Sequence, residues 1–125
     1  MRNPLFICLC LFLAGCASML APEYSFVFTN STNALLRNVG CTGTGGFQAS
    51  AGSMIPGSHK SDELIPNPIP DEVTVVWQTL DGQNHSQRIA IKSQLPSRFR
   101  GEVVLTFTPD GNVVLSHQPY FELPR

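Results

Sequence analysis

The sequence predicts an all-β protein: a single antiparallel β-sandwich of six or seven short strands, which follows a cleaved signal peptide. Asp81-Gly82 and Asp110-Gly111 each separate two runs of alternating apolar and polar residues, and this is the strongest short-range signal of a β-hairpin. No stretch repeats apolar residues with the 3.6-residue period of a helix. Ten prolines and ten glycines among 125 residues suit many short strands joined by turns.

The first fifteen residues have the layout of a secretory signal peptide. Residues 1–3 carry one basic side chain, residues 4–13 (PLFICLCLFL) are almost entirely apolar, and residues 14 and 15 are small. A transmembrane helix is the alternative, because residues 4–21 contain no charge. Pro4 and the lack of a basic cluster after this segment favour the signal peptide.

Leu13-Ala14-Gly15-Cys16 resembles the lipobox of bacterial lipoproteins. The resemblance implies that the chain is cut before Cys16, that Cys16 is lipidated with palmitate-type acyl chains, and that the mature protein is held in a membrane. In that family an Asp after the Cys marks retention in the inner membrane, so Ala17 implies the outer membrane, facing the periplasm. Residues 16–23 then form the lipidated Cys and a tether, whose seven residues after Cys16 span at most about 25 Å.

The four cysteines do not form a disulfide framework. Cys8 and Cys10 lie in the predicted signal peptide and Cys16 carries the lipid, which leaves only Cys41 as a thiol. A lone cysteine in an oxidising compartment is either buried and inert or available for an intermolecular bond. Burial in the core is the simpler interpretation.

The β-sandwich domain is expected to span residues 24–125. Residues 24–29 (YSFVFT) place Tyr24, Phe26 and Phe28 on one face, as in a half-buried strand. A polar turn follows, and residues 34–39 predict a second, weaker strand.

The first hairpin joins residues 72–80 (EVTVVWQTL) to residues 85–92. Val73, Val75 and Trp77 share one face of its first strand, so Trp77 is expected to fill the space between the two sheets. An exposed Trp platform for carbohydrate is the alternative, but it would need polar neighbours on that face.

The second hairpin joins residues 102–108 (EVVLTFT) to residues 113–117. Its turn contains the second Asp-Gly pair, in which glycine supplies the positive φ that a tight turn requires. Six or seven strands of this kind close most simply as an antiparallel sandwich.

Three other segments show little strand pattern. Residues 40–61 are expected to form a binding loop or a mobile strip. Residues 66–70 (PNPIP) are expected to be an extended connector. Residues 93–101 (SQLPSRFRG) predict a single helical turn or an irregular loop. Arginine beside an aromatic residue is enriched at interfaces, so Arg98, Phe99 and Arg100 are candidate contacts to a partner, although Phe99 could instead face the core.

No motif points to catalysis, a cofactor or a metal. The glycine-rich residues 40–46 lack the Gly-Lys-Ser/Thr of a phosphate-binding loop, and the chain has no GxGxxG in a βαβ unit. His59, His85 and His117 lack metal-ligand spacing. Without the predicted signal peptide, the chain contains seven basic and nine acidic residues, which gives a net charge near −2. The charges are scattered, so binding to nucleic acid is not predicted.

From Phe26 onward the order of features resembles small lipoproteins of bacterial type VI secretion and toxin–immunity systems. The matching features are Asn30-Ser31-Thr32, Pro70-x-x-Val73-x-Val75-x-Trp77, Leu95-Pro96-x-x-Phe99-x-Gly101 and the second Asp-Gly hairpin. The resemblance implies a lipid-tethered module that binds a protein, either a toxic enzyme or a component of a secretion machine. No motif identifies a particular effector, and an accessory envelope lipoprotein without a toxin partner is the alternative.

Overall fold

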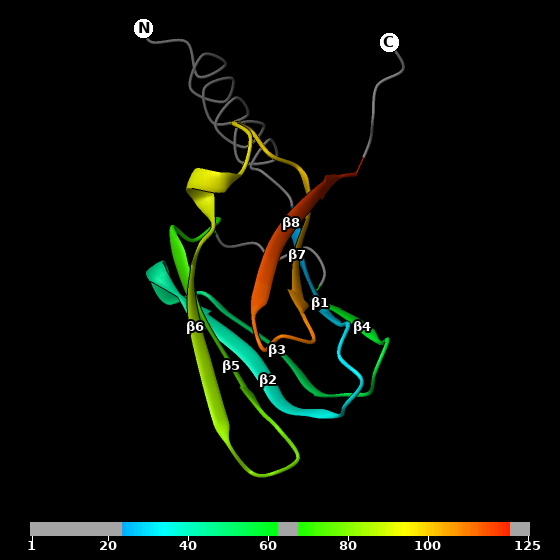
Figure 1. The fold of residues 1–125 in the computed structure, drawn as a ribbon. Coiled ribbons are helices and arrows are strands. Elements are labelled where there is room, and N and C mark those ends of the chain that lie inside the picture. The colour runs from blue at the N-terminus through cyan, green and yellow to red at the C-terminus, as the bar shows by residue number, and fades with distance from the viewer. Residues whose placement is uncertain (1–23, 63–67, 121–125) are drawn as a thin grey trace, which may run out of the picture.

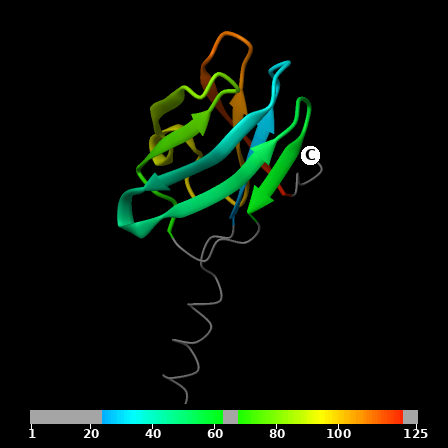
Figure 2. The ribbon, with the colours of Figure 1, turned by 90° about the horizontal axis from the view of Figure 1, so that it is seen from below.

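A computed structural model describes residues 24–62 and 68–120, which form an all-β sandwich. Two four-stranded sheets, with strand orders β4-β1-β7-β8 and β3-β2-β5-β6, pack face to face (Figures 1 and 2). The predicted signal peptide, Cys16, the tether and residues 66–67 lie outside the described residues. The eight strands are β1 (Tyr24–Asn30), β2 (Leu36–Gly43), β3 (Gln48–Met54), β4 (His59–Asp62), β5 (Glu72–Gln78), β6 (Asn84–Ala90), β7 (Gly101–Phe107) and β8 (Val113–Pro119).

The sheets differ from the prediction in strand number and in one pairing. The described residues contain eight strands rather than six or seven, and β1 pairs with β7 in parallel, from Tyr24↔Gly101 to Asn30↔Phe107. The other strand pairs are antiparallel. A parallel pair needs a long connection, and here the whole second sheet lies in sequence between the two strands. No local pattern could have revealed it.

The prediction that residues 40–61 form a binding loop or a mobile strip is wrong. They contain the end of β2, all of β3 and most of β4. The buried residues of β3 are Ala49, Ala51 and Met54, and small side chains give little apolar alternation in a sequence. β4 has no fully buried residue. These strands are therefore defined by their pairing with β2 and β1 rather than by their own composition.

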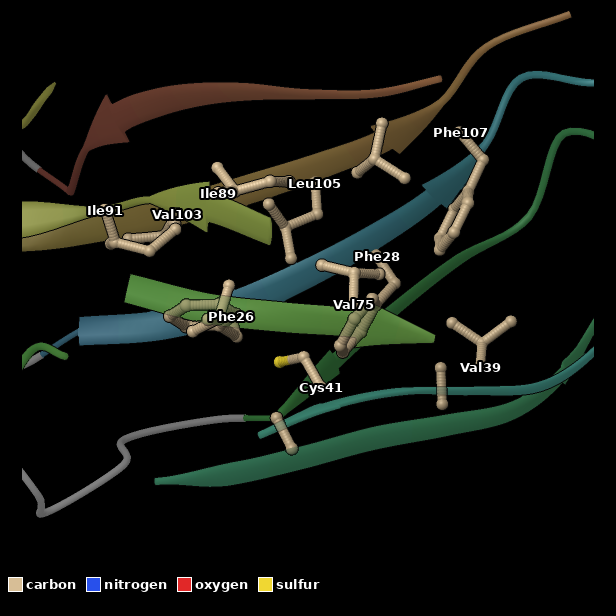
Figure 3. Close-up of a cluster of buried hydrophobic side chains, with 14 of the residues drawn as sticks. Phe26, Phe28, Val39, Cys41, Val75, Ile89, Ile91, Val103, Leu105 and Phe107 are labelled. Atoms are coloured by element: carbon tan, nitrogen blue, oxygen red, sulfur yellow. The ribbon is translucent and has the colours of Figure 1, made fainter. Parts of the chain in front are cut away.

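The core between the sheets contains the large residues that the alternation predicted (Figure 3). Tyr24, Phe26 and Phe28 of β1 are fully buried. Trp77 of β5 is 6% exposed; its ring stacks on His85 at 5.4 Å and meets Phe107 of the opposite sheet edge-on at 5.2 Å. Trp77 is thus a core residue and not a carbohydrate platform.

The two Asp-Gly hairpins form as predicted and have the same geometry. The Thr79 N–H donates to the Gln83 carbonyl at 3.1 Å, and the Thr108 N–H donates to the Asn112 carbonyl at 2.9 Å. Gly82 and Gly111 adopt φ values of 84° and 85°, which explains the glycine in each turn. In each turn the threonine hydroxyl also donates to the aspartate two residues later.

These turns predict a specific dependence of stability on pH. Hydrogen bonds, first of all from the Thr79 and Thr108 hydroxyls, hold the pKa values of Asp81 and Asp110 below their ordinary range. A lowered pKa stabilises the fold above the unfolded carboxyl pKa of about 4, and that contribution is lost as the pH falls below it. We therefore expect the free energy of unfolding, measured with urea, to fall less between about pH 6 and about pH 3 for the D81N/D110N double variant than for the wild type. Equal losses in the two proteins would contradict this.

Candidate protein-binding site

The loop over residues 92–100 connects the two hairpins at the end of the sandwich where β1 and β7 begin (Figure 1). It starts with one 3₁₀ turn, Lys92–Gln94, and is irregular from Leu95 to Arg100. Ile91, fully buried, fixes its beginning, and the Ile91 N–H donates to the Asp71 carbonyl at 2.9 Å. Both predicted forms, a helical turn and an irregular loop, are therefore present in succession.

Beneath this loop runs a groove of about 410 Å³. Its apolar lining comes from Ile69 and Leu95, both partly buried, together with prolines and Phe99. The exposed side chains of Lys92 and Arg98 lie at its rim. The Tyr24 hydroxyl donates to the Pro68 carbonyl at 3.2 Å, so the groove lies beside the start of β1. The complete lining is Pro68, Ile69, Lys92, Leu95, Pro96, Ser97, Arg98 and Phe99.

The structure separates the three candidate contact residues into two groups. Phe99 is 6% exposed, and its ring meets that of His117 edge-on at 5.6 Å. It therefore packs into the core, and the prediction that its side chain offers a surface contact is corrected. Arg98 and Arg100 are exposed on either side of it. Arg98 has a φ of 55°, a left-handed conformation that is uncommon for a residue with a side chain.

Sequence reasoning found the arginines but not the groove beside them. Ile69 and Leu95 are 26 positions apart in the sequence, and only the fold brings them together. The available signal was an apolar residue, Ile69, between two prolines. A solvated connector does not require such a residue.

The two long sides of the sandwich are closed to different extents. At one side β3 and β4 are bridged by the Lys60 ammonium, which donates to the carbonyls of Ala51 and Ser53 at 2.8 and 2.7 Å, and by the Ser50 N–H, which donates to Asp62 Oδ2 at 3.0 Å. At the other side the amide of Gln87 in β6 bonds both backbone groups of Val113 in β8, at 2.8 Å each.

The remaining polar residues do not assemble into a reactive centre within the described part of the chain. Cys41 is 2% exposed, as expected, and burial raises the pKa of its thiol to about 12, with the Asp62 carboxylate adding to the effect. No group of three or more potential metal ligands occurs in residues 24–62 and 68–120. Among these residues there is also no helix with the length and apolar character needed to cross a membrane.

Comparison with known proteins identifies a similar fold. No protein-family model and no curated protein matches the chain. A solved structure, described as the NMR structure of the protein from Eubacterium rectale, is similar with a TM-score of 0.54 and 11% sequence identity, over 79% of this chain and 91% of that one. At this identity the similarity supports the sandwich fold alone.

Proposed function

We propose that this chain is a lipid-anchored, periplasmic protein-binding module of the outer membrane. The observation that carries the proposal is the groove at residues 68–69 and 92–99, an apolar hollow with the cations Lys92 and Arg98 at its rim. Apolar surface with arginine beside it is the composition enriched at the centre of protein interfaces. The lipid anchor rests on the lipobox at Cys16, and the domain provides the contact surface.

The loop is held in a defined shape, which favours binding. Phe99 anchors it in the core, and the Arg100 carbonyl accepts a hydrogen bond from the Tyr120 N–H at 3.2 Å. Arg98 keeps a left-handed backbone, a conformation that costs free energy and is held in place by the surrounding structure. A preformed loop loses less conformational entropy when it binds. Arg98 and Arg100 thus remain the proposed partner contacts.

The resemblance to lipoproteins of toxin–immunity systems makes the favoured partner a toxic enzyme, which the module would block, or a component of a secretion machine. An accessory role in the envelope is the alternative. Deletion of the gene, with and without an attacking sister strain, separates them. An immunity protein should be dispensable in a strain that lacks the toxin and required under attack by a strain that delivers it. A mutant that is impaired alone and no worse under attack would support the accessory role.

The arginines provide a direct prediction. Replacing Arg98 and Arg100 together with glutamine should weaken capture of the partner protein by at least about tenfold, the range for interface hot spots. The melting temperature should hardly change, because exposed substitutions usually alter stability by less than about 0.5 kcal/mol. Arg37→Gln, on the exposed surface of β2, is the matched control. Unchanged capture, or a large loss of stability, would mean that the arginines serve the fold.

A further inference from the structure

The outer edge of β8 has the properties of a docking site for an extended peptide segment. β8 is the last strand of its sheet (Figure 1), and among the described residues β7 is the only strand that pairs with it. The pairing runs without a register shift from Phe107↔Val113 to Gly101↔Pro119. An edge strand of this kind presents backbone N–H and C=O groups that no neighbouring strand has satisfied.

The hydrogen bonds at the two ends of β8 show which backbone groups point outward. The Asn112 carbonyl and the Tyr120 N–H both bond toward the β7 side, to Thr108 and Arg100 respectively. In an antiparallel pair the bonded residues alternate, so the even-numbered residues between them face β7. Val113 fits this order, because its N–H and C=O both point away from β7 and bond the side-chain amide of Gln87 in β6. Leu115 and His117 therefore direct their N–H and C=O groups outward.

Between Val113, which Gln87 bonds, and Pro119, which has no N–H, the described residues show none of the features that usually block an edge strand. Such features are charged side chains, prolines, bulges or a covering element. Residues 113–118 (VVLSHQ) contain no lysine, arginine, aspartate, glutamate or proline. Within residues 24–62 and 68–120, no hydrogen bond is formed by the outward backbone groups of Leu115 and His117. The Gln87 amide blocks the edge only at Val113, whereas several bonds close the opposite side at β3 and β4.

The positive charges of Lys92 and Arg98 indicate which kind of peptide segment would bind beside β8. Phe99 contacts His117 of β8 and also lines the groove whose rim carries Lys92 and Arg98. A strand added to β8 would therefore reach these cations at the end of β8 nearest Pro119. Antiparallel addition is slightly more stable per residue than parallel addition, and it brings the N-terminal end of the added segment there.

We propose that the protein partner adds an extended segment antiparallel to the outer edge of β8, paired at Leu115 and His117, with acidic residues at its N-terminal end beside Lys92 and Arg98. This is recognition by strand addition, in which main-chain hydrogen bonds provide the attraction and side chains the selectivity. It rests on the proposed function and names the kind of segment that the module binds.

The test uses the lipidated, ¹⁵N-labelled chain in detergent micelles and two synthetic peptides. One has the sequence DDTVTVT and the other KKTVTVT, with blocked ends. The acidic peptide should shift the amide resonances of Leu115 and His117 and slow their hydrogen exchange, since these N–H groups gain partners. The amides of Val114 and Ser116 already face β7 and should keep their exchange rates. The acidic peptide should bind at least tenfold more tightly than the basic one.

Two variants make the test specific. His117→Pro removes one outward N–H, a position where an edge strand tolerates proline, and should abolish the slowed exchange at Leu115. The K92E/R98E double variant leaves the edge intact and should reverse the preference between the peptides. No slowed exchange at Leu115 and His117 with millimolar peptide, or equal binding of both peptides by the wild type, would overturn the proposal. So would a dimer in sedimentation whose Leu115 and His117 amides are protected without peptide.

The outcomes also separate this proposal from the proposed function. If neither peptide pairs with β8 but the arginine double variant loses its partner, the binding function stands and the mode of binding is wrong. If the acidic peptide pairs as expected but deletion of the gene has no effect under attack, the edge accepts a strand and the immunity role is wrong.

Discussion

Replacing Trp77 with alanine is expected to lower the free energy of unfolding by roughly 3–5 kcal/mol. The Trp77 side chain is 6% exposed and belongs to one sheet, whereas Phe107, which it meets at 5.2 Å, belongs to the other. Its other face stacks on His85 at 5.4 Å. Alanine would remove the contact that joins the sheets at this end and leave a cavity that a strand-bound backbone cannot close.

Val76 provides the matched control, because it is the next residue in the same strand and faces outward. It is 44% exposed, so Val76→Ala should cost less than about 1 kcal/mol. Urea unfolding followed by circular dichroism measures both variants under one condition. If Trp77→Ala also costs less than about 1 kcal/mol, Trp77 does not hold the sheets together, whatever its burial.

Where the sequence carries large alternating side chains, it was sufficient to locate the strands. The faces predicted for β1 and β5 are the buried faces, with Phe26, Phe28 and Val75 fully enclosed. The Asp-Gly turns were predictable for a local reason, since the positive φ of Gly82 and Gly111 belongs to the turn itself. Such features depend on neighbours within a few residues, and a single sequence records them directly.

The features that escaped prediction depend on residues far apart in the chain. β2 has register shifts between Leu36 and Gly40, which break its alternation, and Asn38 adopts a positive φ of 52° there. β4 contains only polar residues, HKSD, and is defined by its pairing with β1 and by the side chain of Lys60. Local composition cannot reveal strands of this kind.

The candidate site shows the same division. The exposed arginines were predictable from the composition of SQLPSRFRG, but Phe99 between them is buried in the fold and packs against His117 of β8. The outward direction of the backbone N–H and C=O groups of Leu115 and His117 follows from the hydrogen bonds that Thr108 and Arg100 form with the two ends of β8. Which edge of a sheet is open is a property of strand order, and strand order requires the whole fold.

Replacing Cys16 with serine is expected to abolish lipid attachment completely. The lipobox resemblance assigns the acyl chains to this sulfur, and a serine hydroxyl does not replace a thiolate nucleophile in that modification. Each buried methylene contributes about 0.8 kcal/mol to membrane binding, so one chain holds a protein marginally and two or more hold it stably. Labelled palmitate should therefore enter the wild type and be absent from Cys16→Ser, which should also retain residues 1–15 and migrate as a larger species.

Cys41→Ala is the matched control, because Cys41 is the other cysteine of the predicted mature chain. Its sulfur is buried between the sheets with a pKa of about 12, so neither an acyl donor nor a modifying enzyme can reach it in the folded domain. The Cys41→Ala variant should take up as much label as the wild type and stay in the membrane fraction. Equal labelling of Cys16→Ser and the wild type would refute the anchor. Loss of label from Cys41→Ala alone would mean that the lipid is attached to Cys41 and not to Cys16.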